Sequence, residues 1–87
     1  MPTARYKFFR DTSMRGFLSG NRASTDAINA VSDWSNAASG RSYELQSEED
    51  ETVVVDIMWS ELDYTADVNL DDFCRKRGVT RSYVQPA

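Results

Sequence analysis

The segment SEEDETVVVDIMWSELDY (Ser47–Tyr64) carries the strongest strand signal in the chain, together with seven carboxylates. Within it, residues 51–60 alternate in polarity, which is typical of a β-strand with one face in the core. The apolar face comprises Val53, Val55, Ile57 and Trp59. The other face is only half polar, because Val54 and Met58 flank Asp56. Such a mixed face favours either a central strand or a surface that meets a partner.

The neighbouring residues predict further strands. Arg41–Gln46 alternates in polarity and Ser47–Asp50 reads as a four-residue turn, so the two together predict a hairpin. Arg5–Thr12 is rich in aromatic residues and predicts a strand near the N-terminus. Ser13–Asn21 fits either a short strand or an irregular loop, because glycines interrupt its apolar residues.

Two segments have the pattern of helices. Ser24–Gly40 is the stronger, since its apolar residues recur at helical spacing and Gly40 suits the left-handed residue that follows a helix. Asn69–Gly78 is shorter, with Asn69 as the cap, acids in the first turn and bases in the last. Residues 61–68 fit a loop or a continuation of the preceding strand.

The order β(β)αββα predicts a single compact α+β domain over residues 1–87. We expect a small antiparallel sheet of three to four strands with two helices on one face. Residues 79–87 form the tail, which is either mobile or packed through Val79, Tyr83 and Val84. A core of this size is small, so a homodimer would help it, although no feature of the sequence requires one.

The composition argues against several classes of protein. The chain has no histidine and one cysteine, Cys74, so it can form neither an internal disulfide nor a Ser-His-Asp or Cys-His arrangement. Its apolar runs are too short to span a membrane, and its first residues lack the apolar stretch of a signal peptide. We therefore expect a soluble cytoplasmic protein.

The acids do not fit a metal site or a catalytic site. Residues 63–71 alternate oxygen-bearing side chains as calcium loops do, but a loop starting at Asp63 or Asp67 has no glutamate at its twelfth position. A nuclease would need acids that converge on Mg²⁺, and no spacing here is diagnostic of one. We expect no enzymatic activity, no cofactor and no metal ion.

The charge is distributed unevenly along the chain. Residues 1–43 carry six basic and three acidic side chains, whereas residues 44–87 carry four basic and eleven acidic ones. All eleven acids lie between Glu44 and Asp72, a stretch without lysine or arginine. This bias predicts either a solvated face that protects a sheet edge or a surface that docks on a basic partner protein. The docking residues would be Glu48, Glu49, Asp50, Glu51, Asp56, Glu61, Asp63 and Asp67.

In size, acidic charge and lack of catalytic residues, the chain is similar to the small acidic proteins that phages make against host nucleic-acid machinery. Anti-CRISPR and DNA-mimic proteins are among these. The similarity implies a non-enzymatic inhibitor in the host cytoplasm, which would block the basic nucleic-acid-binding site of a partner protein. Direct contact with nucleic acid is not expected of such a protein.

The C-terminal segment supports a competing hypothesis. LDDFCRKRGVTRSYV (Leu70–Val84) resembles the first half of a helix-turn-helix motif, with Gly78 at the turn. The resemblance implies a small nucleic-acid-binding regulator, whose contact residues would be Arg75, Lys76, Arg77 and Arg81. Pro86 would interrupt the second helix, and the acidic remainder of the chain would oppose DNA.

Overall fold

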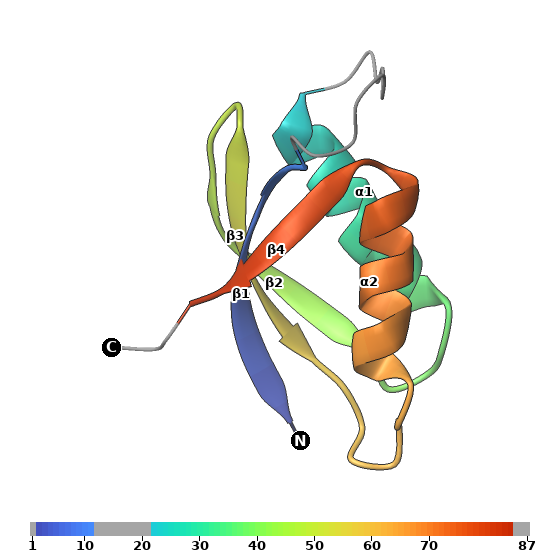
Figure 1. Ribbon diagram of the computed structural model, residues 1–87. Coiled ribbons are helices and arrows are strands. Elements are labelled where there is room, and N and C mark those ends of the chain that lie inside the picture. The colour runs from blue at the N-terminus through green and yellow to red at the C-terminus, as the bar shows by residue number, and fades with distance from the viewer. Residues whose placement is uncertain (1, 12–21, 85–87) are drawn as a thin grey trace.

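A four-stranded sheet carries both helices on one face, so the molecule has two layers (Figure 1). The computed structural model describes residues 2–11 and 22–84. Its elements are β1 (Thr3–Arg10), α1 (Ala23–Asn36), β2 (Ser42–Glu48), β3 (Thr52–Met58), α2 (Ala66–Lys76) and β4 (Val79–Tyr83). The predicted α+β class, an antiparallel sheet with two helices, is confirmed. Neither helix in these described ranges has the length and apolarity that a membrane crossing requires.

The strands lie in the order β2-β3-β1-β4, and every neighbouring pair is antiparallel. Strand β1 therefore lies between β3 and β4, and the two halves of the chain interlock as split βαβ units. Strand β3 is central, between β2 and β1, which is one of the two explanations that its mixed outer face suggested. A bulge between Leu45 and Ser47 interrupts the β2–β3 ladder.

The core lies between the sheet and the helices. The predicted apolar residues point into it: Val53, Val55 and Ile57 of β3 are buried, and Trp59, directly after β3, is partly buried. Trp34 of α1 is fully buried, and its indole N–H donates to the carbonyl of Ala66 at 2.8 Å. The largest core side chain thus keeps its one polar atom paired while it joins the two helices.

Both helices begin or end earlier than the sequence pattern predicts. Helix α1 ends at Asn36, and Gly40, which has the expected left-handed conformation (φ +81°), turns the chain toward β2 after the helix has ended. Helix α2 begins at Ala66, before the predicted cap Asn69. Asn69 lies inside the helix instead, and its side chain accepts a hydrogen bond from Arg41 at 3.0 Å. It therefore makes a tertiary contact and does not cap α2.

The C-terminal segment corrects the predicted order of elements. Val79–Tyr83 is a strand, β4, which pairs with β1, so this part of the predicted tail belongs to the sheet. The helix-turn-helix interpretation is wrong for the same reason, since the residues after Gly78 extend rather than coil. Gly78 (φ +66°) ends α2 as predicted. The strand or loop considered for Ser13–Asn21, and residues 85–87, lie outside the described residues.

Candidate functional site

The eight acids predicted to form one docking surface lie in three separate places. Residues 48–51 form the tip of the β2–β3 hairpin, and Asp56 lies in the middle of β3. Glu61 and Asp63 lie in the connection between β3 and α2, and Asp67 lies in the first turn of α2. The hairpin tip and this connection are at opposite ends of the sheet (Figure 1). The eight residues therefore do not form one continuous surface.

The hairpin tip is held in place by two sets of contacts. The N–H of Glu49 donates to the carbonyl of Thr52 at 2.8 Å, which closes the turn. The carboxylate of Asp50 pairs with the guanidinium of Arg22 at 3.0 Å, and the carbonyl of Asp50 accepts the N–H of Ser24 at 3.4 Å. These contacts attach the tip to the start of α1.

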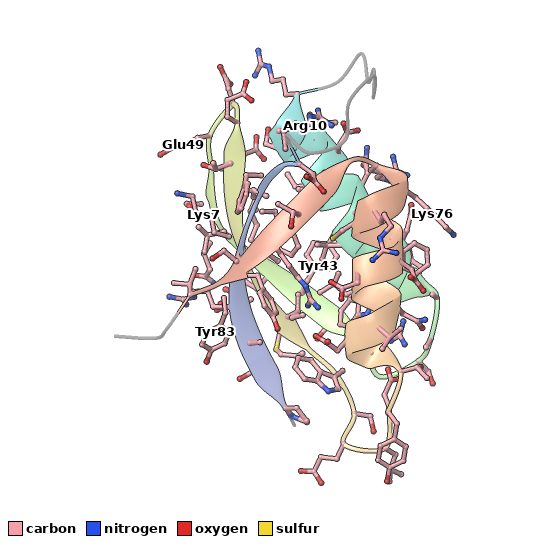
Figure 2. All side chains as sticks on the ribbon, viewed as in Figure 1. Lys7, Arg10, Tyr43, Glu49, Lys76 and Tyr83 are labelled. Atoms are coloured by element: carbon pink, nitrogen blue, oxygen red, sulfur yellow. The ribbon has the colours of Figure 1, made fainter. Side chains whose placement is uncertain are left out.

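Three carboxylates at the tip are left to solvent. Glu48, Glu49 and Glu51 are exposed, and none of them forms an ion pair with a residue that the structure describes. The hairpin projects beyond the rest of the sheet, with Glu49 at its end (Figure 2). The tip therefore presents concentrated negative charge that Arg22 neutralises only in part, through Asp50.

Asp56 has a partner that its neighbours in sequence do not reveal. It lies opposite Arg5 in the β1–β3 register, and Arg5 donates to its two carboxylate oxygens at 2.6 and 2.9 Å. The hydrogen bond from Arg5 lowers the pKa of the Asp56 carboxyl. The pair lines a hollow of about 230 Å³, to which Glu44 and Met58 also contribute. The side chain of Asp56 is thus already engaged within the sheet.

Asp63 belongs to an internal network centred on Arg41. Only 1% of the Arg41 side chain is exposed, and its guanidinium lies 5.1 Å from the centre of the Trp34 ring. Arg41 donates to both carboxylate oxygens of Asp63 at 2.7 and 3.2 Å, to the carbonyl of Trp34 at 3.1 Å, and to Asn69. The hydrogen bond from Arg41 lowers the pKa of Asp63. This network joins the end of α1, the β3–α2 connection and the start of α2.

Asp67 also pairs within the chain. Arg81 of β4 reaches Asp67 at 2.7 Å and Asp71 at 2.9 Å, and these two acids are one helical turn apart on α2. The same guanidinium lies 4.5 Å from the centre of the Tyr6 ring. Arg81 therefore fastens α2 to the sheet, which is a structural role for an arginine that the competing hypothesis assigned to DNA.

The other basic residues of that hypothesis lie together at the end of α2, and one of them is already ion-paired. Arg77 pairs with Asp33 of α1 at 2.8 Å. Arg75 and Lys76 are exposed in the last turn of α2, and Lys76 lies 5.2 Å from the centre of the Phe73 ring. Two exposed cations beside an ion-paired one make a weak electrostatic footprint for nucleic acid.

Within the described parts of the chain, no three His, Cys, Asp or Glu side chains are arranged to hold a metal ion. Cys74 is buried in α2. Burial raises the pKa of its thiol to about 12, so little of it is thiolate near neutral pH.

Three exposed apolar side chains lie close together in the sequence after β3. Leu62, Tyr64 and Val68 are 78%, 86% and 61% exposed, at the end of the β3–α2 connection and the start of α2. Their segment had been assigned only to a loop or a continued strand. No local pattern marks them, because their exposure follows from where Arg41 and Trp34 hold the connection.

Comparison of the chain with protein-family models, with curated proteins and with solved structures finds no match.

Proposed function

We propose that this chain is a non-enzymatic module that binds a basic surface of a partner protein through the tip of its β2–β3 hairpin. The supporting observation is that the tip carboxylates Glu48, Glu49 and Glu51 are exposed and have no ion-pair partner among the described residues. Three other predicted docking acids, Asp56, Asp63 and Asp67, are committed to arginines of the chain itself. The proposed contact is therefore narrower than the sequence suggested.

The contacts that hold the tip support this assignment. The Glu49–Thr52 hydrogen bond closes the turn that carries these carboxylates, and an ordered turn loses less conformational entropy on binding. Complementary charge raises the association rate and discourages wrong partners. If the partner uses the same basic surface for nucleic acid, the bound module excludes that ligand and acts as an inhibitor.

Charge reversal at the tip tests the proposal. The tagged chain would be used to capture partners from a lysate of its native cells, beside two variants with the same change in net charge. E49K/E51K reverses the tip, whereas E44K/D72K reverses two exposed acids outside it. We expect capture to be lost only for E49K/E51K and to weaken with added salt.

Two results would contradict the proposal. One is retention of the same partners by E49K/E51K, and the other is equal loss in both variants, which would reflect net charge alone. A gel shift with random duplex DNA distinguishes this proposal from the hypothesis of a nucleic-acid-binding regulator. Binding of the DNA by the chain itself at physiological salt would favour the regulator.

A further inference from the structure

The connection between β3 and α2 concentrates apolar surface. Of the six large apolar side chains that are exposed among the described residues, three lie within residues 62–68: Leu62, Tyr64 and Val68. Two successive turns shape this short segment: the Asp63 N–H donates to the Ser60 carbonyl at 2.9 Å, and the Ala66 N–H donates to the Asp63 carbonyl at 3.4 Å. Single exposed apolar residues are ordinary, but such a group indicates an interaction surface.

Hydrogen bonds hold the backbone of the β3–α2 connection around Leu62 and Asp63. Asp63 lies between Leu62 and Tyr64, and its carboxylate accepts hydrogen bonds from Arg41 and from the hydroxyl of Thr65 at 3.2 Å. The N–H of Leu62 donates to the hydroxyl of Ser60 at 3.2 Å. An ordered backbone reduces the conformational entropy that this segment loses on binding.

The surroundings of the apolar group are negative. Glu61 is exposed and has no ion pair with a described residue, and Asp67 remains 66% exposed beside Arg81. A hollow of about 320 Å³ adjoins the group, lined by Leu62, Asp63 and three small residues. The complement of this surface is an apolar face flanked by positive charge.

We propose that Leu62, Tyr64 and Val68 form a docking site for a basic amphipathic helix of a partner protein. The apolar face of such a helix covers the three side chains, and its Lys or Arg residues meet the exposed carboxylate of Glu61. A second copy of this chain is disfavoured, because it would bring Glu61 and Asp67 against the same acids. This site lies at the opposite end of the sheet from the hairpin tip and does not require the tip to bind anything.

A titration followed by NMR tests the site. The probe is a helical peptide of about 14 residues made of Leu and Lys on opposite faces, added to the ¹⁵N-labelled chain. We expect chemical-shift changes centred on residues 61–68. A variant with Leu62→Ser, Tyr64→Ser and Val68→Ser should bind at least about tenfold more weakly, whereas E49K/E51K should keep its shifts at residues 61–68. Tyr64→Ser alone serves if the triple variant loses its native spectrum.

Several outcomes would overturn the proposal. These are shifts centred on the hairpin tip, equal binding by the serine variant, or equal binding by a matched Lys and Ser peptide, which would show that charge alone suffices. Sedimentation equilibrium tests whether a second copy of the chain occupies the surface. A dimer that the serine substitutions abolish would assign the surface to that second copy. E49K/E51K keeps the two proposals separate, since it removes only the hairpin contact.

Discussion

The guanidinium of Arg41 holds both carboxylate oxygens of Asp63, through Nε at 2.7 Å and Nη2 at 3.2 Å, across twenty-two positions of the sequence. Arg41 is buried and its remaining donors reach the carbonyl of Trp34 and the side chain of Asn69. A buried cation with this many acceptors fixes the geometry of the segments it joins. The exposed apolar group at residues 62–68 depends on that geometry.

Removing Asp63 should cost more stability than removing Arg41. Asp63→Ala leaves a buried guanidinium without its charge partner, so we expect the midpoint of thermal unfolding to fall by about 15 °C. Arg41→Met removes the buried charge itself and fills part of the space, so the midpoint should fall less. Circular dichroism melts of both variants measure the difference, and an equal or larger loss in Arg41→Met would contradict this account.

Acid should weaken the fold partly through Asp56. Its pKa is lowered in the folded state by the hydrogen bond from Arg5, so the folded chain binds this proton less readily than the unfolded chain does. The resulting stability is present above about pH 4 and is lost as the pH falls below it.

Urea unfolding at pH 5 and pH 3 checks the contribution of Asp56. The loss of stability between the two should be smaller in Asp56→Asn than in the unmodified chain. The difference should be modest, because the Asp56 and Arg5 side chains are 27% and 39% exposed. Asp72→Asn, at an exposed position without an ion pair among the described residues, is the matched control and should leave the loss unchanged.

Cys74 should resist alkylation while the protein is folded. Its thiol is buried and its pKa is raised to about 12, whereas the reactive species is the thiolate. At pH 8, iodoacetamide should label the native chain at least about a hundredfold more slowly than the chain in denaturant. Mass spectrometry over time measures both rates, and comparable rates would show that α2 opens readily.

Gly78 should be intolerant of a side chain. It has a φ of +66° between α2 and β4, and an L-residue in this conformation costs about 1–2 kcal/mol. Gly78→Ala should therefore lower the free energy of unfolding by about that amount in urea. Ser82→Ala, at an exposed position of β4, should change it by less than about 0.5 kcal/mol. Equal effects would argue against a strained conformation.

Local patterns were sufficient to predict most of the fold. The alternation around Val55 identified the core face of β3, and the helical spacing around Trp34 identified the buried stripe of α1. Strand β4 was missed because Val79–Tyr83 is short and Arg81 faces the helices, where a polar residue is unexpected. Arg81 is stable on this face because it pairs with Asp67 and Asp71 of α2. That pairing depends on the tertiary structure and leaves no local signal in the sequence.

The candidate site was predicted less well, for a related reason. The stretch from Glu44 to Asp72 has no lysine or arginine of its own, so it seemed to lack counter-charges. Its partners are Arg5 of β1, Arg81 of β4, Arg41 just before β2 and Arg22 just before α1. Arg5 and Asp56, for example, are fifty-one positions apart. Which distant charges pair is decided by the topology of the sheet, and the order of charges along the sequence does not reveal that topology.

The central place of β1 has a consequence for biosynthesis. Residues 3–10 leave the ribosome before both of their partner strands, which are residues 52–58 and 79–83. The middle of the sheet is therefore completed only after the last strand has emerged, and until then the ring of Phe8 has no finished core to enter. A nascent chain stopped before residue 79 would present that ring to chaperones, so this sheet cannot be completed until residues 79–83 have emerged.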